Sequence, residues 1–242
     1  MNAELSEAIV NGRCLIFFED RHVIQKQDVL DSLLYAQLAA SRKYPRKKVD
    51  FDKWRETWLA AALRFGWVLN ASERISQRPP DALGSTLWNW IRSVRTALVP
   101  EASLGKDEEV ARRSCERYPE QDAISLLAGQ TLWIDPESSK PDASSTGTVE
   151  TGVTLQLGFV GPTGNDMLLI QIHFTSRQSL TPGFLFDVLD PALVVGNVDF
   201  DFYSIRLVEP VYSQFRDAFD AALKDKRAAF IEPLKGADDA SY

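Results

Sequence analysis

Cysteine and histidine are scarce in this 242-residue chain, which contains two residues of each kind. Structural zinc sites are built from about four such ligands, usually at short spacings such as Cys-x-x-Cys, and no such spacing occurs. The sequence therefore predicts no metal site. Cys14 and Cys115 could form a disulfide only with each other. We expect both to remain reduced, because the first residues lack the basic and apolar regions of a secretory signal.

Motifs of the common enzyme classes are also absent. The chain has no Gly-x-x-x-x-Gly-Lys phosphate loop, no Gly-x-Gly-x-x-Gly, no Gly-x-Ser-x-Gly elbow and no His-Glu-x-x-His helix. No apolar run approaches the ~18 to 20 residues that a membrane-spanning helix requires. We therefore expect a cytoplasmic protein without a membrane span or a cofactor, and we interpret it as a non-enzymatic protein.

The excess of acidic residues lies entirely in the C-terminal part of the chain. Residues 1–134 carry 19 Lys and Arg against 18 Asp and Glu, whereas residues 135–242 carry 8 against 16. A surface that binds nucleic acid needs clustered cations. This distribution argues against nucleic acid as a partner of the C-terminal part.

The clearest structural pattern is a β-hairpin over residues 149–176. Odd-numbered residues between 149 and 159 are apolar or β-branched, and most of the even-numbered ones are polar or glycine. Residues 161–165 combine Pro, Gly and Asn and are typical of a turn. Apolar residues alternate again in the second run. The pattern predicts two antiparallel strands with one face on the core and the other face polar.

Helical spacing dominates the chain before this hairpin. Apolar residues recur at intervals of three and four after Asp28, which we expect to cap a helix, and again around Trp54 and Trp58. A third helical stripe covers residues 87–98. These stripes predict a helical N-terminal half.

Further strands are expected at fewer places. Residues 67–75 could form a strand that pairs with the hairpin, and residues 197–208 form the third clear strand. Residues 131–134 are a candidate for a brief strand. We interpret residues 5–18 as a short helix followed by a short extended piece.

These patterns together predict an α+β fold. N-terminal helices would pack on an antiparallel sheet of about three to five strands, with a C-terminal helix after the last strand. We expect a single domain over residues 1–242, because a strand at 67–75 would join the helical half to the sheet. The expected parts are a mainly helical region at residues 1–134, a mobile loop at 135–148, a strand region at 149–208, the last helix at 209–231 and a frayed tail at 233–242.

His173 is the titratable group with the most suggestive position. It lies mid-strand on the polar face, where Asp199 or Asp201 of the third strand could approach it. A histidine beside a carboxylate can act as a general base. The same placement also suits a histidine that forms a structural hydrogen bond, which is the commoner case.

A cluster of cations is a second candidate site. Arg42, Lys43, Arg46, Lys47 and Lys48 lie within seven residues. Such a run can bind phosphate, anionic lipid or an acidic partner. Its simpler interpretation is a solvated loop between two helices.

The tryptophans are a third candidate, because they could line a ligand pocket among the helices. Tryptophans at helical spacing usually belong to the core. Trp88 and Trp90 are two residues apart, so they cannot face the same way on one helix. We predict that one of the two reaches a helix edge or a partner surface.

Three functions remain open. We favour a non-enzymatic soluble interaction or assembly protein that self-associates or binds a protein partner, since the aromatic residues and sheet edges offer contact surface. One alternative is an enzyme of unrecognised family that uses His173 with Asp199 or Asp201. The other is a small-molecule binder with an aromatic pocket among the helices.

Overall fold

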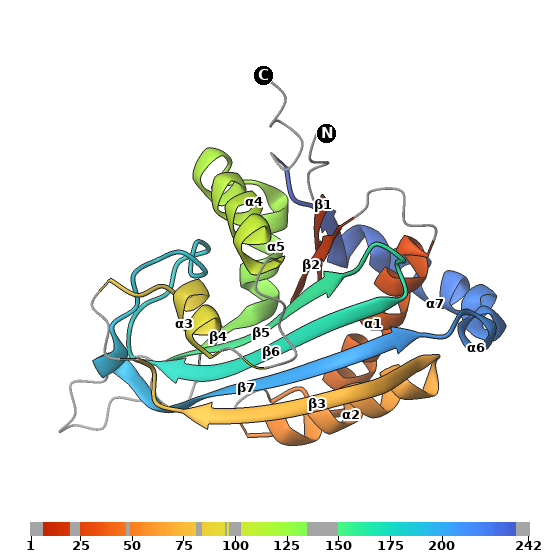
Figure 1. Ribbon diagram of the computed structural model, residues 1–242, viewed down its shortest axis with the longest axis horizontal. Helices are drawn as coiled ribbons and strands as arrows, with labels where there is room; N and C mark the ends of the chain where they lie inside the picture. The colour runs from red at the N-terminus through yellow and green to blue at the C-terminus, as the bar shows by residue number, and fades with distance from the viewer. Residues whose placement is uncertain are drawn as a thin grey trace.

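One large mixed sheet organises the part of the chain that a computed structural model describes, residues 7–19, 25–46, 49–80, 84–94, 96, 103–134 and 150–235 (Figure 1). The strands are β1 (Glu7–Asn11), β2 (Cys14–Phe18), β3 (Trp67–Gln77), β4 (Leu132–Ile134), β5 (Thr151–Val160), β6 (Asp166–Ser176), β7 (Val194–Leu207) and β8 (Ile231–Pro233). The helices are α1 (Lys26–Lys43), α2 (Phe51–Arg64), α3 (Leu87–Ser93), α4 (Ser103–Arg117), α5 (Asp122–Thr131), α6 (Glu209–Tyr212) and α7 (Arg216–Phe230), with short 3₁₀ helices η1 (Pro191–Leu193) and η2 (Ser213–Phe215).

The sheet is larger than the sequence predicted. Its eight strands run in the order β3-β7-β6-β5-β2-β1-β8, with β4 paired to β5 off this path. Most neighbours are antiparallel, but β2 runs parallel to β5. The fold is α+β, whereas the prediction of a purely antiparallel sheet of three to five strands is wrong.

The first two strands account for much of this error. The segment expected to begin with a helix forms the antiparallel pair β1 and β2, joined by a turn at Gly12 with φ of 61°. Every residue of Cys14–Phe18 is buried. A strand that is covered on both faces shows a continuous apolar run rather than alternation, so its sequence resembles a buried helix.

The predicted hairpin is confirmed as β5 and β6, which pair from Thr151↔Ser176 to Val160↔Met167. The second face of the hairpin carries polar residues, as predicted, but it is covered rather than open to solvent, because every residue of β5 is buried. The strand predicted from Trp67 is also confirmed as β3, although its partner in the sheet is β7 rather than the hairpin.

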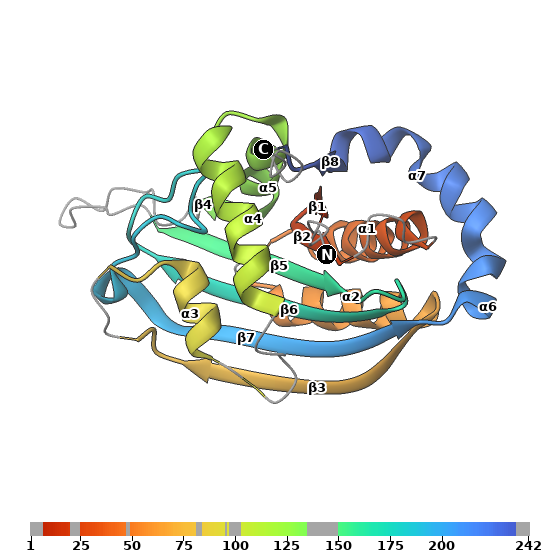
Figure 2. The same cartoon turned by 45° about the horizontal axis from the view of Figure 1, so that its top comes forward.

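Helices cover both faces of the sheet (Figure 2). Residues of α3, α4 and α5 share one apolar cluster with β5, β6 and β7. Residues of α1, α2 and α7 share a second cluster with the opposite face. The protein is therefore layered, with a helical layer on each side of the sheet.

The two faces of β7 pack against different helical layers. Phe200 and Phe202 belong to the cluster under α3, whereas Tyr203 and Ile205 belong to the cluster under α1 and α2. The pairing with β6 is irregular between Val195 and Asp199, but alternation is unbroken from Asp199 to Leu207, so the two halves of β7 are apolar on different faces. The face toward α2 is left polar in the first half of β7.

Ion pairs join α1 to α7, two helices on the same side of the sheet. α1 begins at Lys26, and the predicted cap Asp28 lies inside the first turn without capping it. The Asp28 carboxylate instead accepts two hydrogen bonds from Arg216 of α7, at 3.0 and 2.6 Å. Asp31 accepts two from Arg227, at 2.9 and 2.7 Å. Paired contacts of this kind hold α7 against α1.

Some predictions fall on residues that the structure does not describe. The expected mobile loop at 135–148 and most of the expected tail, from residue 236 onward, lie outside the described residues. In the described part of the chain, no helix combines the length and the apolar character that crossing a membrane requires.

Candidate functional site

Polar side chains line the sheet face that α2 covers. Two neighbouring rows across β5, β6 and β7 carry Thr154, His173 and Asp199, and then Gln156, Gln171 and Asp201. The residues between them along each strand belong to the apolar cluster on the opposite face. These six residues, together with Arg13 from the turn between β1 and β2, are called the polar cluster below.

His173 is enclosed by aromatic rings at the edge of the polar cluster. Its imidazole stacks on Phe51, the first residue of α2, at 3.8 Å between ring centroids, and on Trp133 of β4 at 6.2 Å. The Nδ1 atom lies 3.1 Å from the Thr154 hydroxyl, which accepts a hydrogen bond from the Trp133 indole. The hydroxyl can therefore donate its own proton to Nδ1, and this favours a neutral imidazole.

The protonation state of His173 follows from this environment. Burial lowers the pKa of His173 from 6.5 to about 4, against the opposing effect of the Asp199 charge. Asp199 is its register partner on β7. At neutral pH the ring is thus uncharged and a weak base, which is poorly matched to general base catalysis.

Asp201 is held by arginines rather than by His173. Arg55 of α2 donates a hydrogen bond to one carboxylate oxygen at 2.6 Å, and Arg74 of β3 lies 3.8 Å from the same oxygen. Burial raises the pKa of Asp201, and the two arginines oppose this shift. The predicted partnership of His173 with Asp201 is replaced by an ion pair that ties α2 to the sheet.

The two glutamines at the centre of the polar cluster are not satisfied by other described groups. Gln171 has no exposed surface, and neither its amide nitrogen nor its amide oxygen has a hydrogen-bond partner. The amide nitrogen of Gln156 and the second oxygen of Asp201 are likewise buried without partners. Buried polar groups are nearly always hydrogen-bonded, so this concentration of free donors and acceptors is unusual.

Arg13 brings a positive charge to the same region. The residue is 4 % exposed, and its guanidinium lies over the Trp54 ring at 4.3 Å from the centroid. One of its nitrogens donates to the Ser41 hydroxyl at 3.3 Å. Its charge contributes to the lowered pKa of His173, which places it within electrostatic reach of the cluster.

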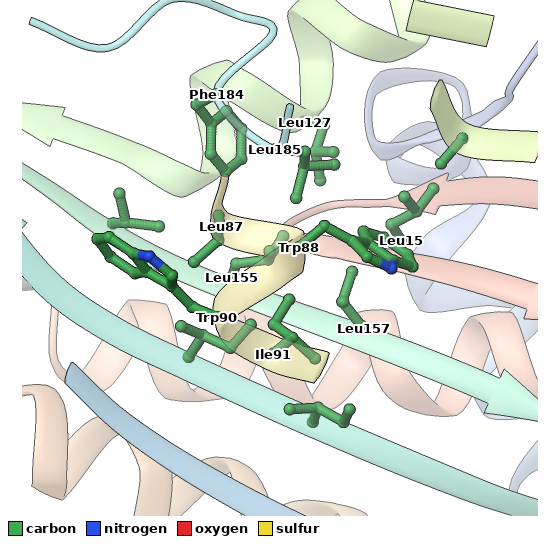
Figure 3. Packing of buried hydrophobic residues seen from close by; sticks show 14 of the residues in the cluster. Leu15, Leu87, Trp88, Trp90, Ile91, Leu127, Leu155, Leu157, Phe184 and Leu185 are labelled. Carbon is green, nitrogen blue, oxygen red and sulfur yellow. The ribbon is translucent and has the colours of Figure 1, made fainter. Parts of the chain in front are cut away.

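Neither tryptophan of the pair predicted to reach a helix edge or a partner surface is exposed. Trp88 and Trp90 leave α3 in different directions, as their spacing requires, but both are fully buried (Figure 3). Trp88 meets Phe17 edge-on at 6.0 Å, and Trp90 meets Phe174 at 5.7 Å. α3 lies between the sheet and the segment that carries Phe184, so each side of the helix has a partner.

The described residues of the cationic run are exposed, unlike the buried residues of the polar cluster. Arg42 and Lys43 are exposed in the last turn of α1, where cations suit the helix dipole. Arg46 pairs with Asp50 at 3.3 Å. The other two predicted cations, Lys47 and Lys48, lie outside the described residues.

Sequence reasoning identified His173, Asp199 and Asp201 and missed the residues beside them. Arg13, Gln156 and Gln171 were not singled out, because polar residues that alternate with apolar ones are expected to face solvent. Nothing in the local sequence distinguishes a polar face under a helix from a polar face under water.

Comparisons with known proteins give weak likenesses. No protein-family model matches the chain, and no curated protein matches it. Among solved structures, a chain titled delta-endotoxin has 9 % identity and a TM-score of 0.45, over 82 % of each chain. The Evf virulence factor has 10 % identity and a TM-score of 0.40, over 94 % of this chain and 93 % of its own. The Cyt-like delta-endotoxin CytC of Dickeya dadantii has 12 % identity and a TM-score of 0.25, over 72 % and 83 %. Scores this low assign neither a family nor a function to this chain.

Proposed function

We propose that this protein is a non-enzymatic binding protein that encloses a small polar molecule between α2 and the sheet. The observation that carries the proposal is Gln171, whose amide nitrogen and oxygen are both buried and unbonded in the middle of the sheet. Leaving such groups unpaired costs about 1 to 3 kcal/mol each. A bound molecule with donors and acceptors would recover that cost.

The surroundings of Gln171 support this function over catalysis. On one side lies the free amide nitrogen of Gln156, and on the other lies the free oxygen of Asp201. Trp54 and Phe51 of α2 supply apolar walls over the polar cluster. A few convergent polar groups under aromatic side chains are typical of a small-molecule site. His173 is neutral and Asp201 is ion-paired, so neither is placed to transfer a proton.

Gln171→Leu tests the proposal, because leucine has a similar volume and no polar atoms. If the Gln171 amide is unpaired when no ligand is bound, the purified ligand-free variant should be at least as stable as the wild type. A thermal-shift screen of small polar compounds should find compounds that stabilise the wild type and not the variant. Gln37→Leu is the matched control, since both polar atoms of the buried Gln37 amide are hydrogen-bonded. Its nitrogen donates to the Asn11 carbonyl, and its oxygen accepts from the Arg13 backbone N–H. That variant should be destabilised.

A loss of stability in Gln171→Leu would contradict the proposal. If Gln171→Leu lowers stability as much as Gln37→Leu does, the Gln171 amide is satisfied by ordered water as a structural group, and the binding proposal fails.

A second candidate function is self-association, favoured by the open edge of the sheet. β3 is the terminal strand, and its outer side forms no backbone hydrogen bonds with other described residues. An antiparallel β3–β3 contact centred on Ile75 would set Arg74 against Ser76 and Glu73 against Gln77. This register opposes no like charges, and exposed edges are templates for strand addition. The interface would lie here rather than at the buried Trp88 and Trp90.

Two substitutions of exposed Gln77 test this second candidate by light scattering. Gln77→Lys would face the partner's Glu73 and should strengthen a dimer. Gln77→Glu would place like charges opposite each other and should weaken it. If the wild type and both variants stay monomeric at every accessible concentration, self-association through β3 is excluded.

A further inference from the structure

Arg13 indicates which class of molecule the polar cluster takes, an inference that rests on the binding function proposed above. Arginine is almost never fully buried unless it is paired with an acid. Among the described residues, no carboxylate forms an ion pair with Arg13, although many of the other arginines have such a partner. A buried cation without an anion is costly.

The position of Arg13 is fixed by its backbone and by its ring contact. The backbone N–H of Arg13 donates to the side-chain oxygen of Gln37 at 3.0 Å. Its backbone carbonyl accepts a hydrogen bond from the backbone N–H of Gln156 at 2.9 Å. The guanidinium packs against Trp54. Burial lowers the pKa of Arg13 to about 10, so the group is still charged at neutral pH. The cation is therefore preorganised rather than free to reach solvent.

The acids of the polar cluster do not neutralise this charge. Asp201 is bound by Arg55 at 2.6 Å, with Arg74 at 3.8 Å. Asp199 lies 3.9 Å from Arg74. Both carboxylates therefore have cations nearer than Arg13. This leaves one positive charge without an anion on the residue whose backbone carbonyl bonds Gln156, and the Gln156 amide nitrogen also has no partner.

We infer that the bound molecule carries a carboxylate that pairs with Arg13 and accepts a hydrogen bond from the Gln156 amide. The planar fork of a guanidinium matches a carboxylate, and the single uncompensated charge suits a monoanion. The neighbouring Gln171 amide offers a donor and an acceptor for a further polar group of the same molecule. Because Arg13 and both glutamines are nearly or fully buried, the molecule must be small.

Acetate and acetamide separate the charge requirement from mere polarity, since they have nearly the same shape. Thermal unfolding would be followed in each, at constant ionic strength set by a bulky sulfonate. Acetate should raise the Tm of the wild type, by roughly 5 to 10 °C at a hundredfold excess over its Kd. Acetamide should raise it much less.

Arg13→Met removes the charge and keeps an unbranched apolar side chain. Without acetate this variant should be as stable as the wild type or more so, and acetate should not stabilise it. Arg206→Met is the matched control, because Arg206 pairs with Asp166 at 2.6 Å on the exposed surface of β6 and β7. That variant should keep the full response to acetate.

The outcomes separate the two proposals. If acetamide stabilises the wild type as well as acetate does, and Gln171→Leu abolishes the effect, the binding function stands and the carboxylate inference is wrong. An acetate response that survives in Arg13→Met also overturns the inference. If neither compound shifts the Tm of the wild type, the carboxylate inference fails, and the binding function then depends on the wider screen with Gln171→Leu.

Discussion

Replacing His173 with phenylalanine should remove a defined part of the protein's sensitivity to acid. The imidazole has a pKa of about 4 in the folded protein, against 6.5 for a histidine exposed to solvent in the unfolded chain. Between these values the unfolded chain binds a proton that the folded chain does not. The stability contribution of the neutral ring is therefore complete above pH 6.5 and is lost as the pH falls toward 4.

The magnitude follows from the two pKa values. The shift of His173 from 6.5 to about 4 corresponds to a maximum of about 3 kcal/mol, at about 1.4 kcal/mol per unit. At pH 5 the unfolded histidine is almost fully protonated and the folded one is about one-tenth protonated, which gives a loss of about 2 kcal/mol relative to neutral pH. Phenylalanine can keep the stacking on Phe51 and Trp133 but cannot titrate.

Urea unfolding at pH 7 and pH 5 measures this loss directly. The free energy of unfolding of the wild type should fall between the two pH values by about 2 kcal/mol more than that of His173→Phe. Carboxylates titrate in both proteins and cancel in the difference. An equal drop in His173→Phe and the wild type would refute the burial argument.

Two further predictions concern the apolar cluster under α3. Leu155→Asp should be severely destabilised, by several kcal/mol, because Leu155 has no exposed surface and an aspartate there would have no partner; soluble variant protein with an unchanged Tm would contradict this. Trp88→Ala and Trp90→Ala should each lower the free energy of unfolding by about 3 to 5 kcal/mol without changing the molar mass in solution. A change of oligomeric state at normal stability would instead place one indole at an interface.

Local patterns predicted the elements that alternate cleanly. The hairpin of β5 and β6 follows from apolar residues at every second position and from the turn residues after Val160. α2 follows from tryptophans four residues apart, and Gly66, with φ of 105°, comes directly after its C-cap Phe65. These features depend on neighbours in the sequence.

The missed features depend on partners that are distant in the sequence. β2 joins the sheet by a parallel pairing with β5, more than 130 residues later, and no local pattern encodes that contact. The same holds for the polar cluster. Gln156 and Gln171 are buried because α2 covers them, and their sequence context resembles that of a solvent-facing strand.

A crystal structure grown in acetate would test the central claim most directly, through the electron density between Arg13, Gln156 and Gln171. This claim predicts a non-water molecule in the polar cluster, an acetate ion whose carboxylate lies on the Arg13 guanidinium and the Gln156 amide. Separate water peaks that satisfy each glutamine, with no molecule linking them and no anion beside Arg13, would contradict it.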